Sequence, residues 1–306
     1  MDHPDYLSVH IKSVVQQHQL IGMGKPKHPL FSVLRFDDFP PIENENRVKL
    51  LSDCYQITLK KNCPCKLKYG QTNYDFDEGV MSFFSPKQVS ILEPGDVLPS
   101  SGWLLVIHPD FLRTYAISQK IKGYGFFDYT MNEALIMSED EEAAIEAIFG
   151  QIEREYQLPI DNFSQDVLIA NVDLLLTHCN RYYNRQFITR KPANQPLLDK
   201  VDKLLTNYLE AHEGAERGLP TASFIASQLN LSPKYLSDLL RQQTGRSIQQ
   251  HIHDKVIERA KEQLATTTLS VSEIAYALGF DYPQSFNKLF KNKTQTSPLE
   301  YRQSFN

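Results

Sequence analysis

The sequence predicts an α+β fold: an N-terminal antiparallel β-barrel or jelly roll followed by two helices, and then an all-α domain. Three observations predict this order. Residues 31–108 contain short β-rich runs, residues 139–183 change to a helical period, and residues 221–306 contain one helical pattern twice. At roughly 100 to 200 residues per domain, a chain of 306 residues is long enough for two domains.

The composition is that of a folded protein. Hydrophobic residues make up 41% of the chain and charged residues 23%, which excludes the disordered, collagen-like and low-complexity classes. Four cysteines are too few for a disulfide scaffold, and no C-x-x-C pair suggests a zinc ribbon. No apolar run has the length of a signal peptide or a membrane span. We therefore expect reduced thiols, a cytoplasmic location and no membrane partner.

The first domain is expected to be β-rich. Runs of β-branched, aromatic and aliphatic residues alternate with breaks that have turn chemistry, such as 62–64 and 93–96. Several short strands at this spacing are typical of an antiparallel barrel or jelly roll. The expected strands lie at 31–36, 50–59, 65–69, 80–84, 88–92 and 103–108.

Two long helices are expected after the strands, at 139–157 and 164–183. Ser138 is a suitable N-cap for the first, and the acidic residues 139–142 are favourable near a helix N-terminus. The second has an apolar stripe at intervals of three or four residues, so either the barrel or a second copy of the chain must cover it. A helix-mediated homodimer is one reading. The stripe consists of Val167, Leu168, Val172, Leu175 and Leu176.

The first domain carries little chemistry. A metal-binding jelly roll usually opens with His-x-His on a strand, whereas the one such pair here, at 251–253, lies in a helical segment. His108 is interpreted as a capping or surface histidine. Cys63 and Cys65 could form a redox sensor or a soft-metal clip, but no third ligand accompanies them. We therefore predict no catalytic residue, no metal site and no cofactor, and we expect the protein not to be an enzyme.

The boundary between the domains is expected near residues 186–197, where proline and glycine become frequent. The expected domains are 1–190 and 191–306. Charge also changes along the chain: residues 1–220 hold 22 basic and 30 acidic side chains, and residues 221–306 hold 10 and 7. A modestly basic end on an acidic body is expected when only that end meets a polyanion.

A helix-turn-helix begins at Thr221. A short helix at 223–229 is broken by Asn230, which tolerates a left-handed conformation. Ser232 then caps a second helix, and this helix ends at Gly245.

The same arrangement returns 49 to 50 residues later. Residues 272–278 match 223–229, Gly279 replaces Asn230 at the turn, and one inserted residue near Tyr282 keeps the register. In both second helices, a triplet of Leu or Phe residues buries one side and leaves the other side polar.

One long amphipathic helix, 248–266, is expected between the two units, because its apolar residues recur four apart. At 1.5 Å per residue, about 18 residues of such a helix are roughly 27 Å long, near the roughly 34 Å repeat of duplex DNA. Two second helices fixed at its ends could enter successive major grooves on one face of the duplex.

Four spaced motifs near the end of the chain carry a family resemblance. They are 258–264 (ERAKEQL), 269–280 (LSVSEIAYALGF), 285–291 (SFNKLFK) and 297–302 (SPLEYR). Together they resemble the DNA-binding signature of AraC-type (AraC/XylS) transcription regulators. The resemblance implies a cytoplasmic bacterial regulator that binds double-stranded promoter DNA, with a cupin-like N-terminal domain for sensing or dimerisation. The partners it implies are promoter DNA, a second copy of the chain and RNA polymerase, and it identifies no effector.

The same resemblance assigns DNA contacts to both second helices. Polar residues near the start of each helix are placed at base edges, and cations farther along are placed at phosphates, where they supply affinity with little sequence information. The residues expected at base edges are Lys234, Ser237, Asp238, Gln284, Asn287 and Lys288. The residues expected at phosphates are Arg241, Arg246 and Lys291.

These side chains differ in what they can recognise. Gln284 and Asn287 suit paired hydrogen bonds to adenine, whereas Asp238 either accepts from cytosine or orients a neighbour. Pro283 and Ser237 stand where relatives often have larger donors, so we expect less direct readout from the first unit.

Two other classes of function stay open. A cupin-type metalloenzyme with a helical appendage would contain stoichiometric iron, manganese or zinc. A thiol-based redox sensor would lose oxidant-dependent DNA binding when Cys63 or Cys65 is replaced by serine.

Overall fold

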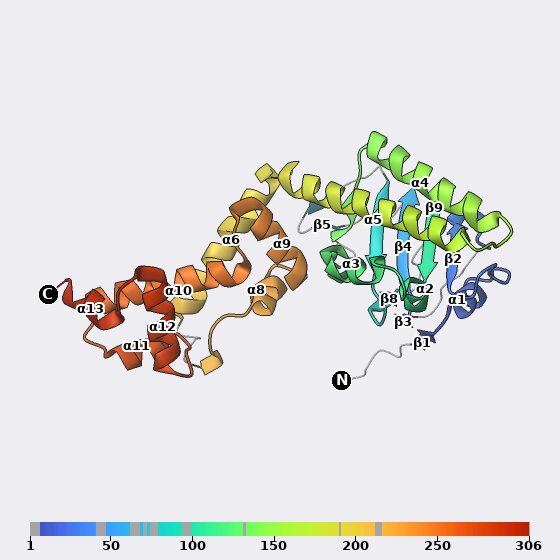
Figure 1. Ribbon diagram of the computed structural model, residues 1–306. Coiled ribbons are helices and arrows are strands. Elements are labelled where there is room, and N and C mark those ends of the chain that lie inside the picture. The colour runs from blue at the N-terminus through green and yellow to red at the C-terminus, as the bar shows by residue number, and fades with distance from the viewer. Residues whose placement is uncertain are drawn as a thin grey trace. The chain divides into compact units, whose positions relative to one another are not determined.

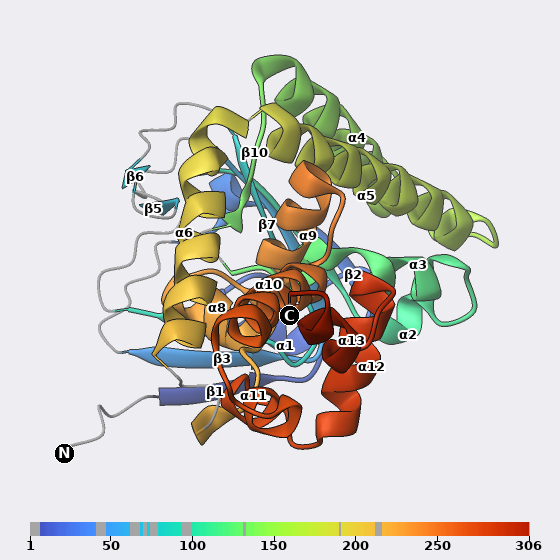
Figure 2. The same ribbon diagram turned by 90° about the vertical axis from the view of Figure 1, so that its left-hand side faces the viewer.

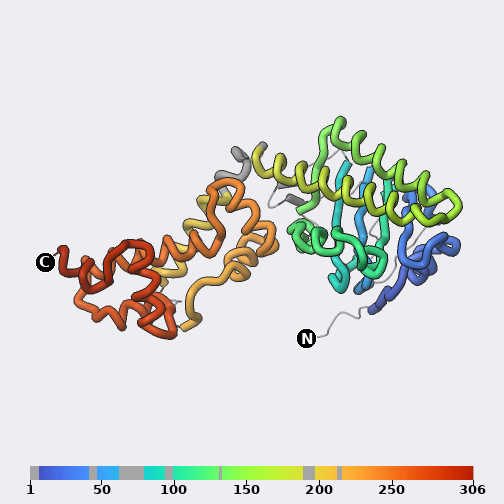
Figure 3. The backbone as a smooth tube through the Cα atoms, viewed as in Figure 1, coloured from blue at the N-terminus to red at the C-terminus, as the bar shows by residue number. Residues whose placement is uncertain are grey.

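The chain forms two compact units in the computed structural model, Met1–Gln186 and Phe187–Asn306 (Figure 1; Figure 3). The described residues are 7–40, 47–61, 68–69, 72–73, 79–93, 99–130, 133–189, 191–211 and 216–305. Within these residues, no helix is both long and apolar enough to span a membrane. Strands lie in the first unit and the second is helical, which confirms the predicted α+β class.

The N-terminal unit is built on a five-stranded antiparallel sheet with the order β10-β7-β4-β9-β2. A three-stranded sheet has the order β1-β3-β8, and β5 pairs with β6. The strands are β1 (Leu7–Ile11), β2 (Phe31–Arg35), β3 (Val48–Ser52), β4 (Tyr55–Lys61), β5 (Lys68–Tyr69), β6 (Thr72–Asn73), β7 (Val80–Phe84), β8 (Val89–Leu92), β9 (Ser101–Ile107) and β10 (Leu135–Ile136).

The single strand expected at 50–59 is wrong, because the chain turns at Asp53 and Cys54 and forms two strands in different sheets. The Asp53 N–H donates to the carbonyl of Ile11 at 2.8 Å, and the Cys54 N–H donates to Ser52 Oγ at 3.1 Å. The partner strand β1 was not predicted, and it pairs with β3 in parallel. The expected antiparallel pairing holds for the other described strand pairs but not for this one.

Helices cover both faces of the five-stranded sheet. On one face, α1 (Val14–Leu20) packs with Leu34, Leu104 and Val106. The other face is covered by the pair α4 (Glu139–Gln157) and α5 (Ser164–Thr189), which lie side by side (Figure 1; Figure 2). The remaining short helices of the unit are η1 (Phe36–Asp38), α2 (Pro109–Leu112), α3 (Ile117–Gly123) and η2 (Gly125–Asp128).

Aromatic contacts hold α4 and α5 on the five-stranded sheet. Trp103 of β9 stacks on Phe149 of α4, with ring centroids 5.6 Å apart and planes 12° apart. Phe83 of β7 contacts Tyr183 of α5 at 6.0 Å. The predicted apolar stripe is thus covered within the chain, except for Val167, whose side chain is 40% exposed.

The C-terminal unit has one apolar core shared by both helix-turn-helix units. The long helix α10 contributes Ile252, Val256 and Ala260 to this core, and all three are fully buried. Helix α6 also belongs to the core through Val201 and Leu205. The helices of the unit are α6 (Lys191–Glu210), α8 (Ala222–Gln228), α9 (Pro233–Thr244), α10 (Ile248–Thr266), α11 (Val271–Ala277), α12 (Pro283–Thr294) and α13 (Pro298–Gln303).

Candidate nucleic-acid interface

Local hydrogen bonds fix the ends of the first helix-turn-helix unit, α8 and α9. Thr221 Oγ1 accepts from the Phe224 N–H at 3.1 Å and caps α8. Ser232 Oγ accepts from the Tyr235 N–H at 3.1 Å and caps α9, as the sequence predicts. Gly245 ends α9 with a φ of 73°, a left-handed conformation that glycine adopts without steric cost.

The second unit, α11 and α12, repeats this order of helices with one extra residue, although no side chain caps the start of α12. Helix α11 begins 49 residues after α8, and α12 begins 50 residues after α9, so the insertion lies between Gly279 and Pro283. The sequence predicts it near Tyr282. A capping box joins Ser270 and Glu273 at the start of α11, and the hydrogen bonds from Ser270 lower the pKa of the Glu273 carboxyl.

Helix α12 presents a polar face to solvent. Phe286 and Phe290 are fully buried in the core, whereas Asn287 and Lys288 between them are exposed. This face has the mixture of amide and ammonium groups that can contact base edges and phosphates. Its exposed residues are Gln284, Asn287, Lys288 and Lys291.

The polar face of α9 differs, because two of its charged side chains pair with each other. Arg241 is exposed, but Lys234, Ser237 and Asp238 are half-buried. Lys234 Nζ lies 3.1 Å from Asp238 Oδ1, one helical turn away, so the two charges neutralise each other. Of the two roles considered for Asp238, this geometry favours orienting a neighbour.

Arg246 follows α9 directly and is also paired. Its Nη1 lies 3.0 Å from Oδ2 of Asp254, which belongs to α10. The other oxygen of the same carboxylate, Oδ1, lies 2.6 Å from Lys293 Nζ in the last turn of α12. Sequence reasoning missed Asp254 and Lys293, because residues 39 positions apart carry no periodic signal for a contact.

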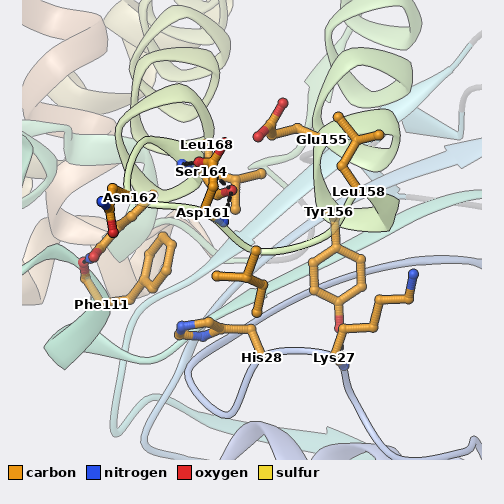
Figure 4. Close-up of a pocket in the computed structure, with 12 residues that line it drawn as sticks. Lys27, His28, Phe111, Glu155, Tyr156, Leu158, Asp161, Asn162, Ser164 and Leu168 are labelled. Carbon is orange, nitrogen blue, oxygen red and sulfur yellow. Dashed lines mark hydrogen bonds between the residues drawn. The ribbon is translucent and has the colours of Figure 1, made fainter.

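A separate cavity of about 270 Å³ lies in the N-terminal unit, beside the turn between α4 and α5 (Figure 4). Its polar residues include Lys27, whose N–H donates to the Tyr156 hydroxyl at 2.8 Å, and His28. Burial lowers the pKa of His28, and its Nδ1 accepts from the Leu30 N–H at 3.1 Å. The cavity's apolar walls are Phe111, Tyr156, Leu158, Ile160 and Leu168.

In the N-terminal unit, His108 serves as a helix cap and Cys54 is a core residue. His108 caps α2 by accepting from the Asp110 N–H at 3.3 Å, which agrees with the expected capping role. Cys54 is buried, and burial raises the pKa of its thiol to about 12. Cys63 and Cys65 lie outside the described residues. In the part of the chain that the structure describes, His, Cys, Asp and Glu form no group of three that could hold a metal ion.

Comparison with known proteins finds one matching family model and several relatives. A family model described as a helix-turn-helix domain matches residues 225–304. The chain is 24% identical over 226 residues, or 70% of its length and 75% of the relative, to an uncharacterized HTH-type transcriptional regulator, YijO, of Escherichia coli K12. It is 35% identical over 107 residues to the arabinose operon regulatory protein of the same organism, covering 35% of this chain and 36% of that protein.

Among solved structures, the C-terminal domain of the two-component response regulator yesN from Fusobacterium nucleatum is 33% identical. That match covers 33% of this chain and 95% of that chain, with a TM-score of 0.29. Of the two curated relatives, the chain spans about a third of the arabinose operon regulatory protein and three quarters of YijO.

Proposed function

We propose that this chain, a member of the AraC family of DNA-binding transcription regulators, binds double-stranded promoter DNA through both of its helix-turn-helix units. One observation carries the proposal: α9 and α12 both begin with proline and end at a left-handed residue, are anchored in one core around α10, and each has a polar face opposite the buried one. An ordinary helical domain would explain the buried face but not a polar face that occurs twice.

In this proposal, α12 supplies most of the direct readout. The amides of Gln284 and Asn287 suit adenine, Lys288 suits guanine, and Lys291 reaches a phosphate. All four side chains are exposed in the chain as it stands.

Helix α9 contributes in a different way. Lys234, Ser237 and Asp238 lie toward base edges, with Asp238 holding Lys234 in place at 3.1 Å. Arg241 contacts a phosphate, which positions the helix without carrying sequence information, whereas Arg246 stays paired with Asp254 at 3.0 Å. Helix α10, with 19 residues and about 28 Å of length, joins the two units, and its length is near the roughly 34 Å repeat of the duplex.

The N-terminal unit is proposed to sense an effector, to form a homodimer, or both, within a cupin-like architecture. Two features support this role. The cavity of about 270 Å³ has apolar walls and polar groups for a small molecule. The turn between α4 and α5 exposes Leu158, Ile160 and Phe163 by 57%, 67% and 68%, which a second copy could cover. A cytoplasmic location and contact with RNA polymerase belong to the same proposal.

Replacing Lys288 tests the proposed readout. Duplexes are first selected from a random library with the full-length protein, and binding of the tightest one is then measured by fluorescence anisotropy. Lys288→Ala should weaken that binding by about 1 to 3 kcal/mol, because a lost base contact costs this much. Loss of the same size on every sequence would reassign Lys288 to a phosphate.

The matched control is Lys122→Ala, which removes an exposed lysine of α3 in the N-terminal unit. It should leave DNA binding within about twofold of the wild type, because the exposed charge lies outside the proposed interface. A chain that selects no sequence from the library would contradict the proposed function itself.

A further inference from the structure

One carboxylate on α10 holds two cations that come from the two helix-turn-helix units. Asp254 Oδ2 lies 3.0 Å from Arg246 Nη1, and Asp254 Oδ1 lies 2.6 Å from Lys293 Nζ. Each oxygen of the carboxylate is thus committed to a different unit. The pairing is an arrangement of three charges rather than an isolated contact.

Both cations lie at the C-terminal end of a helix that is proposed to contact DNA, either α9 or α12; these two helices are called the recognition helices. Arg246 comes directly after Gly245, where α9 ends, and Lys293 is in the last turn of α12, two residues after Lys291. The side chain of Arg246 is 61% exposed and that of Lys293 is 32% exposed. Because neither cation is buried, a phosphate group can compete with Asp254 for both of them.

Phosphate groups can compete because these ion pairs contribute little free energy. An exposed ion pair contributes roughly 0 to 1 kcal/mol to stability, so the three charges add little to the fold. Binding to DNA of unrelated sequence, in contrast, depends almost entirely on the number of cations that neutralise phosphates. A carboxylate that pairs with two such cations therefore weakens non-specific binding in particular.

We propose that Asp254 is a specificity-determining residue that withholds Arg246 and Lys293 from the phosphates of unrelated DNA. The proposal rests on the proposed function, because it concerns how the same interface discriminates between sequences. Contacts of α9 and α12 with base edges do not depend on these two cations. Asp254 therefore weakens non-specific binding more than specific binding and widens the ratio between them.

The variant Asp254→Asn tests this inference, because it keeps the shape of the side chain and removes its charge. Binding of the full-length protein is measured on a random-sequence duplex and on the library-selected duplex, between about 0.05 and 0.3 M salt. We expect roughly fivefold to tenfold tighter binding to the random duplex at about 0.1 M salt. The plot of log K against log salt should steepen by about 0.9 for each cation that reaches a phosphate. The ratio of specific to non-specific affinity should fall.

Two further variants separate this effect from net charge and from folding. Glu258→Gln makes the same charge change one turn along α10, and its partner Lys255 stays paired with Asp202 at 3.0 Å. It should change the affinity for the random duplex by less than about twofold, because no cation beside a recognition helix is released. Asp254→Glu keeps the carboxylate and should behave like the wild type.

The outcomes are distinguishable. If Asp254→Asn changes the salt slope and the affinity ratio no more than Glu258→Gln does, Asp254 has no role in specificity. If Asp254→Asn weakens binding to every duplex with an unchanged slope, the carboxylate supports the fold instead. If the wild-type protein binds no duplex at all, the proposed function fails and this inference fails with it.

Discussion

At the scale of single residues, the two turns of the helix-turn-helix units differ in what they demand. Asn230 has a φ of 55°, in the left-handed region that asparagine tolerates. Gly279 has a φ of 94°, and a Cβ placed on it would lie 2.5 Å from the carbonyl carbon of Gly218. The left-handed turns are predictable from sequence at both positions. The close approach of a distant backbone segment to the second turn is not.

Gly279→Ala should therefore lower the free energy of unfolding of the C-terminal unit by about 2 to 4 kcal/mol. Roughly 1 kcal/mol comes from the positive φ, and the rest from the displaced backbone at Gly218 and Leu219. Urea unfolding followed by circular dichroism measures the change. Gly245→Ala is the matched control: its φ is 73° but its added Cβ would meet no heavy atom within 4 Å, so only about 1 kcal/mol should be lost. Equal losses would contradict the role of the Gly218 contact.

At the scale of elements, the sequence predicts those whose ends are set by local chemistry. The helix predicted at 139–157 is α4, and its Ser138 cap is present. The strand predicted at 80–84 is β7. Strands β1 and β10 were not predicted, because their pairing partners lie far along the chain or because they are only two residues long. The break at Asp53 escaped prediction for the same reason, since it depends on Ile11.

The cap of α10 provides a test at this scale. Ser247 Oγ accepts from the Gln250 N–H at 3.3 Å, and the Ser247 N–H donates to Gln250 Oε1 at 2.8 Å. Ser247→Ala should lower the free energy of unfolding by about 1 kcal/mol, because it leaves the Gln250 N–H without its side-chain partner. The urea midpoint by circular dichroism reports the loss. Ser272→Ala, at an exposed position of α11, should stay within about 0.5 kcal/mol of the wild type. A Ser247 variant as stable as the Ser272 variant would show that the capping box does not stabilise α10.

At the scale of the whole molecule, the candidate interface follows from an internal repeat, whereas its electrostatics depend on tertiary contacts. Gln284, Asn287 and Lys288 can be chosen from sequence because residues three or four apart share a helix face. The pairing of Arg246 and Lys293 through Asp254 joins segments that only the folded C-terminal unit brings together. For the N-terminal unit, no motif identifies a ligand, so neither the cavity nor its lining could be predicted.

The two units have separate cores, and this makes their unfolding separable. Trp103, the only tryptophan of the chain, is 5% exposed in the core of the N-terminal unit, so its fluorescence reports on that unit. Leu236 is fully buried in the C-terminal core, and Leu236→Ala should cost about 2 to 5 kcal/mol there. In urea, Leu236→Ala should shift the circular dichroism transition of the C-terminal unit and leave the fluorescence transition of Trp103 in place. Ile57→Ala, in β4, should do the reverse, because Ile57 is fully buried in the N-terminal unit. If either variant moves both signals together, the units unfold as one cooperative structure, and a change in the N-terminal unit could then reach the DNA-binding helices through stability alone.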